Sequence, residues 1–293
     1  MRVKRSIRFV AVLPSAITLL NGFFGVSAIF IASVEPGLRY HFPMLSRGNL
    51  SFPSVAAWLI IFSMVADALD GSVARASGAS TKFGAQLDSL CDVVSFGVAP
   101  ALLSYNLFAL ELANLYGNEF RFSNFVGRWV LFCAVFYALC ALVRLARFNA
   151  ETNEDAASHM KFAGLPSPAA AGLIISLVLF HEQFASLFMV RFSFPGNAAP
   201  DIFRSASLWC IPFALLMTGL LMVSRVTYPH IVNQLLHKRK PFTVLVLTLF
   251  LGLFAIWNIY VSLLLGFLIF CLSGLFHKLV SVLRRKRKMT GDD

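Results

Sequence analysis

Long, uninterrupted apolar runs are the feature that most constrains how this chain can fold. A helix rises 1.5 Å per residue, so roughly 20 apolar residues cross the hydrocarbon core of a bilayer. Hydrophobic residues make up 58% of the 293 residues and charged residues 13%, and the mean hydropathy is +0.75. This composition is far more apolar than that of a soluble domain. We expect an all-α integral membrane protein, a bundle of about eight spanning helices near residues 9–34, 54–76, 84–108, 126–148, 167–190, 207–225, 242–260 and 261–283.

The rest of the chain adds no second domain and no soluble binding module. No repeat or long polar linker divides it, so residues 1–293 are expected to form a single transmembrane domain. The five cysteines lie in apolar runs without metal-ligand spacing and are interpreted as packing residues, with neither disulfides nor zinc indicated. The six histidines are scattered singly and are interpreted as structural or surface residues.

Basic residues give the orientation, because lysine and arginine are retained on the cytoplasmic side. With the N-terminus inside and eight spans, 19 of the 25 basic residues fall on inner segments. We therefore expect a multi-pass protein of the cytoplasmic membrane with both termini in the cytoplasm. The net charge is +11, and the charged residues border the spans. Anionic lipid headgroups are therefore the expected partners, and nucleic acid is not.

Four aspartates lie in the segment DALDGSVARASGASTKFGAQLDSLCD, residues 67–92. An aspartate at the centre of a spanning helix costs about 2.5–3.5 kcal/mol on insertion scales, so four of them must be compensated. The residues Asp67 and Asp70 are three apart, whereas Gly84, Asp88 and Asp92 recur every four residues. Each set therefore occupies one helix face.

The small and polar residues between the two sets predict a tight cytoplasmic turn, which makes the two helices antiparallel. On that register Asp70 lies opposite Asp88, and Asp67 lies opposite Asp92. Converging carboxylates take up protons or gather cations, and oxygen ligands select hard divalent ions, Mg²⁺ or Mn²⁺. Two such ions balance the four charges, and the cation of Arg75 at the helix exit suits a phosphate.

The spacing Asp-x2-Asp-Gly-x2-Ala-Arg-x8-Gly-x3-Asp-x3-Asp resembles the signature of the CDP-alcohol phosphatidyltransferase family at every defined position. Further segments resemble the branch of that family that transfers to serine, the phosphatidylserine synthases. These are LPSAITLLNGFFG (13–25), DVVSFGVAPALL (92–103), LVRLARFN (142–149) and FAGLPSPAAAG (162–172). The resemblance covers a core of residues 10–230 and leaves two additional C-terminal spans within 242–283.

The resemblance implies roles for these residues. Asp67, Asp70 and Asp88 would be ligands of two divalent cations, and Asp92 would lie near the second cation and act as general base. The CDP group would be bound by Asp67, Gly71, Ala74, Arg75 and Gly84. The implied reaction joins CDP-diacylglycerol and L-serine to give phosphatidylserine and CMP, on the cytoplasmic side of the membrane. Homodimers are usual among the proteins that this chain resembles.

Three polar residues outside the signature have open interpretations. Arg144 and Arg147 share a helix face and are candidates for binding the serine carboxylate or a phosphate; membrane anchoring by positive charge is the equal alternative. Asn21, isolated in an apolar run, is expected to make an interhelical hydrogen bond.

Two alternatives remain at the level of the sequence. The same signature serves choline, inositol or glycerol phosphate as acceptor, and only the flanking segments favour serine. A carboxylate-lined cation transporter also tolerates aspartates in a membrane. A transporter predicts charges continuing toward the outer face, yet the second and third helices carry none there before Glu111.

Overall fold

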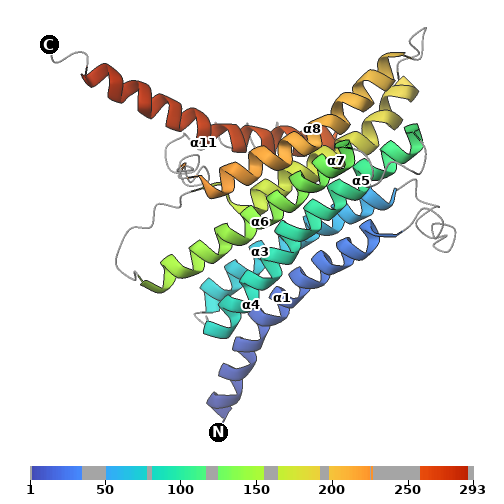
Figure 1. The fold of residues 1–293 in the computed structure, drawn as a ribbon. Helices are drawn as coiled ribbons and strands as arrows, with labels where there is room; N and C mark the ends of the chain where they lie inside the picture. Colours follow the sequence, from blue (N-terminus) through green and yellow to red (C-terminus); the bar gives the residue numbers. More distant parts are fainter. Residues whose placement is uncertain are drawn as a thin grey trace.

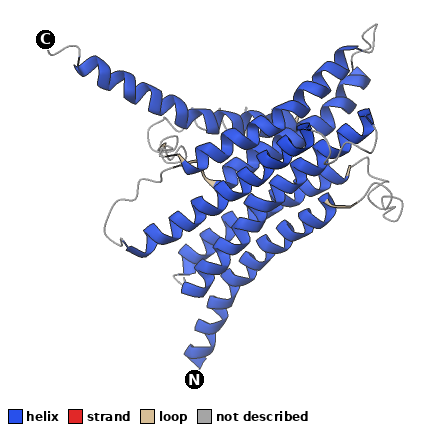
Figure 2. Cartoon of the chain, in the orientation of Figure 1, coloured by secondary structure: helices blue, strands red, loops and turns tan. Residues whose placement is uncertain are grey.

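In the computed structural model, the described part of the chain comprises residues 2–34, 51–77, 81–116, 125–154, 164–191, 198–224, 226 and 258–289. Every element in these ranges is helical, and none of them contains a strand (Figure 2). The elements are α1 (Arg2–Ala32), α3 (Phe52–Ser77), α4 (Lys82–Asp92), the π-helix η2 (Val93–Val98), α5 (Ala99–Tyr116), α6 (Phe125–Glu154), α7 (Ser167–Arg191), α8 (Ala198–Val223) and α11 (Ile259–Met289).

Helices α1 and α3 to α8 run side by side along one diagonal direction, and α11 crosses them at one edge, as Figure 1 shows. Within the described residues, six stretches are long and apolar enough to cross a membrane: Ser15–Ala32, Phe52–Val73, Phe83–Ala113, Phe125–Ala150, Arg204–Val223 and Ile259–Phe276. The chain is therefore a multi-pass membrane protein whose described elements are all helical. Of the eight expected spans, 167–190 corresponds to α7, whose 25 residues also suffice in length, whereas 242–260 lies almost wholly outside the described residues.

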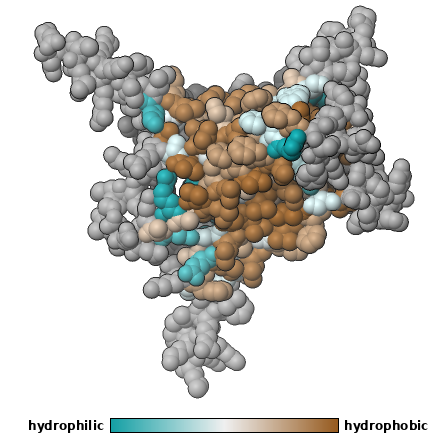
Figure 3. Space-filling model, in the orientation of Figure 1, coloured by the Kyte–Doolittle hydropathy of each residue, from teal (hydrophilic) through white to brown (hydrophobic). Residues whose placement is uncertain are grey.

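The interior of the bundle combines small residues with a few large ones. Ala56, Ala57 and Ile60 of α3 are fully buried, as are Phe96 of η2 and Tyr137 of α6. Large apolar side chains such as Phe23, Phe30 and Phe132 are exposed on the outside instead. Figure 3 shows the described apolar side chains gathered in a central band, with hydrophilic residues at its margins. This is the surface expected of a protein solvated by lipid tails.

Helix α1 packs against α3 and also against α4 and η2. Two glycines permit this approach. A Cβ atom at Gly22 would lie 2.8 Å from Cys91 Sγ, and one at Gly25 would lie 2.9 Å from Ser95 Cα. Small residues at a helix interface let two backbones come close enough for direct polar contacts.

The turn before α7 is held against the end of α8. Gly164 has a φ of 95°, and its backbone N–H donates to the Val226 carbonyl at 2.8 Å. A side chain at this left-handed position would be strained and would also meet the Met222 carbonyl. The following N–H, of Leu165, donates to the Leu221 carbonyl at 3.0 Å. The start of α7 is thereby fixed next to α8.

The C-terminal helix α11 belongs to the bundle as well. It packs against α7, where the Phe267 ring lies directly over Gly172 and occupies the space that a side chain there would need. The Cys271 side chain of the same helix is 3% exposed. A helix without recognised family residues therefore contributes to the core.

Candidate active site

Three of the four signature aspartates converge between α3 and α4. Asp67 comes from α3, and Asp88 and Asp92 come from successive turns of α4. Each offers one carboxylate oxygen, and these oxygens all lie within 4.8 Å of one another. The group includes Asp67 and Asp92, which the sequence predicts to lie opposite each other. Oxygen atoms at this separation are suited to share a hard cation.

The fourth aspartate, Asp70, lies beside this group but is held differently. Its side chain is only 6% exposed, and its Oδ2 atom accepts a hydrogen bond from the Thr18 hydroxyl of α1. It interacts electrostatically with Asp67 and Asp88. Among the described residues, nothing donates to its buried Oδ1 atom. A buried carboxylate oxygen without a donor is costly unless a cation satisfies it, so Asp70 fits a metal-binding role.

The position of Asp92 is fixed by a hydrogen-bond chain from α1. The Asn21 side-chain amide donates to Asp92 Oδ1 at 3.1 Å, and the Ser63 hydroxyl of α3 donates to Asn21 Oδ1. The Ser95 hydroxyl of η2 donates to the backbone carbonyl of Asn21 at 3.2 Å. The interhelical hydrogen bond expected of Asn21 is confirmed. Thr18 and Ser95 lie in segments that resemble the family, but the sequence indicates no role beyond packing for them or for Ser63.

Local structure explains how α4 presents its two aspartates. Thr81 caps the helix, because its hydroxyl accepts from the Gly84 N–H at 3.0 Å. Directly after Asp92 the helix widens into η2, and the Tyr137 hydroxyl donates to the Phe96 carbonyl in this segment at 2.9 Å. Such π-helical turns often occur at functional sites. Here the turn brings Ser95 to Asn21 immediately beyond the last aspartate.

The residues expected to bind CDP are only partly described. Gly71 follows Asp70 on α3 and is half-buried, and Gly84 lies half-buried in the first turn of α4. The side chains of Ala74 and Arg75 lie outside the described residues, although both positions belong to α3.

The two arginines of α6 have different surroundings. Arg144 is partly buried, donates through Nη1 to the Ser167 hydroxyl at 3.0 Å and interacts electrostatically with Asp92. Its buried Nε has no hydrogen-bond partner among the described residues. Arg147 instead donates to the Val223 carbonyl at the end of α8, at 3.4 Å. Arg144 is therefore the arginine associated with the aspartate site.

An open apolar groove with a volume of about 470 Å³ lies next to this region. Met64, which lines it, precedes Asp67 by one turn on α3, and Pro166 and Pro168 flank the Ser167 that Arg144 contacts. The remaining lining residues come from the start of α7 and from α11: Ala169, Ser262, Leu263, Gly266, Phe267 and Phe270. An apolar space next to a carboxylate group suits a ligand with a charged head and a hydrocarbon tail.

Comparison with known proteins gives a consistent result. Residues 11–195 match the family model described as CDP-alcohol phosphatidyltransferase. A CDP-diacylglycerol–serine O-phosphatidyltransferase of Helicobacter pylori is 32% identical over 217 residues, covering 74% of this chain and 71% of that protein. A protein of the same name from Methanocaldococcus jannaschii is 30% identical over 230 residues, covering 78% and 80%. One from Saccharomyces cerevisiae is 33% identical over 166 residues, covering 55% and 51%.

Proposed function

Because the chain belongs to the CDP-alcohol phosphatidyltransferase family, we propose that it transfers the phosphatidyl group of CDP-diacylglycerol to the hydroxyl of L-serine. The products are phosphatidylserine and CMP. The observation that carries the proposal is the meeting of Asp67, Asp88 and Asp92 within 4.8 Å, in a chain whose relatives are named for this reaction.

The four aspartates would hold two divalent cations, Mg²⁺ or Mn²⁺. Asp67, Asp88 and Asp92 supply the converging oxygens, and Asp70 adds a buried oxygen that lacks a donor. Bound cations of this kind neutralise charge on the diphosphate and on the departing CMP. Gly71, Ala74, Arg75 and Gly84, together with Asp67, form the proposed CDP site.

Asp92 is the proposed general base. It accepts the proton of the serine hydroxyl as the serine oxygen attacks the phosphorus that carries diacylglycerol, and the bond from this phosphorus to CMP breaks. Asn21 donates to Oδ1 of Asp92, which leaves Oδ2 as the oxygen for the proton transfer. Holding one oxygen by a fixed amide orients the other, and orientation of the base is a large part of its contribution.

Arg144 is the proposed partner of the serine carboxylate. A planar guanidinium binds a carboxylate through two parallel N–H groups. Arg144 has a buried Nε without a partner among the described residues and lies on the Asp92 side of α6. Arg147, engaged with the end of α8, is assigned to anchoring or general phosphate attraction.

The lipid substrate also accounts for the membrane fold. The diacyl chains stay in hydrocarbon while the headgroup enters a polar site at the edge of the bilayer. We propose that this edge faces the cytoplasm, that the protein resides in the cytoplasmic membrane with both termini inside, and that it is a homodimer. Residues 1–293 form one domain in this proposal, with a catalytic core over 10–230 and two further spans within 242–283.

CMP release from CDP-diacylglycerol by the purified full-length protein tests the proposal. We expect release that requires L-serine and either Mg²⁺ or Mn²⁺ and that stops in EDTA. Choline, inositol and glycerol phosphate, supplied in place of serine, are the matched controls for the acceptor. Equal release with one of these alcohols would reassign the acceptor, and full activity after chelation would remove the metal site. Cation flux in liposomes without CMP release would identify a transporter instead.

A further inference from the structure

A second group of potential metal ligands lies at the other end of the bundle. Glu111 from α5 and His181 and Glu182 from α7 offer ligand atoms that all lie within 4.8 Å of one another. Glu111 is separated from Asp92 by 19 residues of continuous helix, which corresponds to about 28 Å at 1.5 Å per residue. This group is therefore distinct from the aspartate site.

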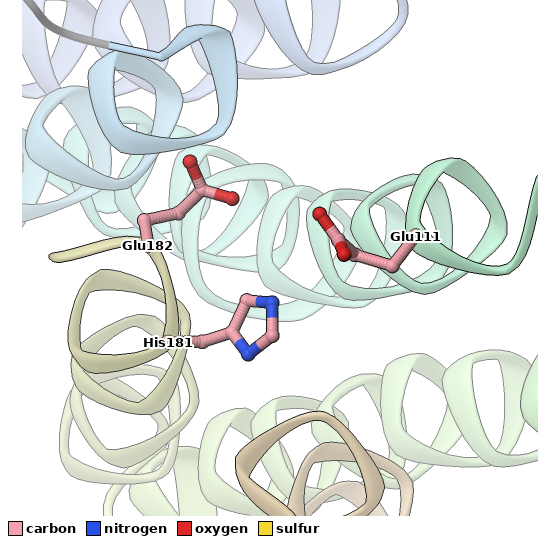
Figure 4. A group of neighbouring side chains, drawn as sticks. All are labelled: Glu111, His181 and Glu182. Carbon is pink, nitrogen blue, oxygen red and sulfur yellow. The ribbon is translucent and has the colours of Figure 1, made fainter. Parts of the chain in front are cut away.

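The imidazole of His181 presents a lone pair to the two carboxylates. The Ser207 hydroxyl of α8 lies 2.9 Å from the Arg204 carbonyl and 2.8 Å from His181 Nδ1. When it donates to the carbonyl, its oxygen accepts from Nδ1. In that arrangement the proton of the neutral ring is on Nδ1, and Nε2 is unprotonated. Figure 4 shows one ring nitrogen turned toward Glu111 and Glu182 and the other turned away from them.

This arrangement is typical of a metal-binding histidine. Such residues donate one ring N–H to a nearby oxygen, which fixes the tautomer and directs the other nitrogen at the ion. His181 is only 2% exposed, and its ring is also hydrogen-bonded to the backbone of Arg204. A ring nitrogen turned toward two carboxylates is favourable only with a proton or a cation between them.

Distance and charge favour a cation. Bonds from Zn²⁺ to nitrogen or carboxylate oxygen are about 2.0–2.2 Å, so two ligand atoms on one tetrahedral ion lie about 3.4 Å apart. The observed span of at most 4.8 Å closes on an ion when the side chains shift by about 1.4 Å at most. Arg204 binds both Glu111 oxygens, at 2.8 and 2.9 Å, but each oxygen keeps a further lone pair.

We propose that Glu111, His181 and Glu182 bind a divalent transition-metal ion, with zinc as the best fit to one imidazole and two carboxylates. The ion joins α5 to α7, and Arg204 and Ser207 of α8 hold two of its ligands from outside. The Arg204 side chain is 44% exposed and Glu182 is half-buried, so the site opens to the surface of the protein. Its role is to fasten three helices.

Zinc retention by the full-length protein tests this site. The protein is stripped with EDTA in detergent, loaded with ZnCl₂ and freed of unbound ions, and zinc per chain is measured by atomic absorption. We expect His181→Gln and Glu182→Gln each to retain one equivalent less than wild type. Asp88→Asn alters the aspartate site and should still retain the equivalent of zinc that is lost from His181→Gln. Ser207→Ala retains the ligands but weakens zinc binding by about 10–100-fold.

Two further readouts make the outcome decisive. Co²⁺ loaded in place of zinc gives a visible absorption band that depends on His181 and Glu182 and survives Asp88→Asn. Circular dichroism and gel filtration select folded variants, and the half-buried Glu182 provides a second variant if His181→Gln does not fold. Equal zinc content in wild type, His181→Gln and Glu182→Gln would overturn the proposal, as would zinc lost from Asp88→Asn but retained in His181→Gln.

Discussion

At the scale of single residues, the site depends on oxygen atoms whose partners come from different helices. Asp92 receives a hydrogen bond from Asn21 of α1, whereas Asp70 receives one from Thr18 of the same helix. Each aspartate thus has one oxygen fixed by α1. The remaining oxygens are available to cations, or, for Asp92, to a proton.

Replacing Asp92 with asparagine tests the base. An amide has nearly the shape of the carboxylate but cannot take up the serine proton, so we expect turnover to fall by about 10²–10⁴-fold. Binding of CDP-diacylglycerol in Mg²⁺ should stay measurable, because Asp67, Asp70 and Asp88 are intact. Single-turnover CMP release and equilibrium binding of the CDP-lipid separate the two effects. Near-normal turnover would remove Asp92 from the base role.

Arginine-to-lysine substitutions at positions 144 and 147 form a matched pair. Lysine keeps the charge but loses the planar pair of donors, so Arg144→Lys should raise the KM for serine by about tenfold, the loss of one charged hydrogen bond. Arg147→Lys should leave the KM for serine unchanged, since Arg147 donates to the Val223 carbonyl at the end of α8. Serine titrations at saturating CDP-diacylglycerol measure both. An unaltered serine KM in Arg144→Lys would argue against carboxylate binding there.

At the scale of elements, the approach of α1 to α4 and η2 assembles the polar chain around Asp92. A Cβ atom at Gly25 would collide with Ser95 Oγ and lie 2.9 Å from Ser95 Cα. Ser95 in turn donates to the Asn21 carbonyl. The absence of a side chain at Gly25 therefore sets the distance at which Asn21 meets Asp92.

Gly25→Ala should lower the thermal unfolding midpoint in detergent, because overpacking costs about 1–3 kcal/mol and exceeds the helix propensity gained. Gly266→Ala is the control, since a Cβ atom there has nothing within 4 Å. It should leave the midpoint unchanged or raise it, because alanine stabilises a helix by up to about 1 kcal/mol relative to glycine. Equal midpoints for the two variants would show that α1 accommodates the added methyl group.

At the scale of the whole molecule, the two groups of titratable side chains lie toward opposite ends of the continuous helix formed by α4, η2 and α5. The aspartate end also carries Arg144 of α6 and the capped start of α4, and the other end carries Glu111 and Arg204. One group therefore lies nearer the cytoplasmic surface of the membrane and the other nearer the outer surface. This polarity makes the proposed cytoplasmic orientation testable.

Cysteine labelling with a membrane-impermeant maleimide tests the orientation. Gln86 in α4 and Phe125 at the start of α6 are both exposed, at the aspartate end and the opposite end. Cys210, the exposed native cysteine, is first replaced with serine. Gln86→Cys should be labelled only in inverted vesicles, and Phe125→Cys only in intact cells. The reverse pattern would place the aspartates on the outer side.

The sequence by itself determined the membrane class, the family and the helix faces that carry the aspartates. The length of an apolar run and a spacing of i, i+3 or i, i+4 are local properties of a helix. It also marked Asn21, since one amide in an apolar run needs a partner. The tertiary structure alone decided which partner that was, which of the two arginines faces Asp92, and that His181 meets Glu111. These contacts join residues 70 or more apart in several cases, and they depend on how closely whole helices approach, which glycines and a π-helical turn set and no local pattern encodes.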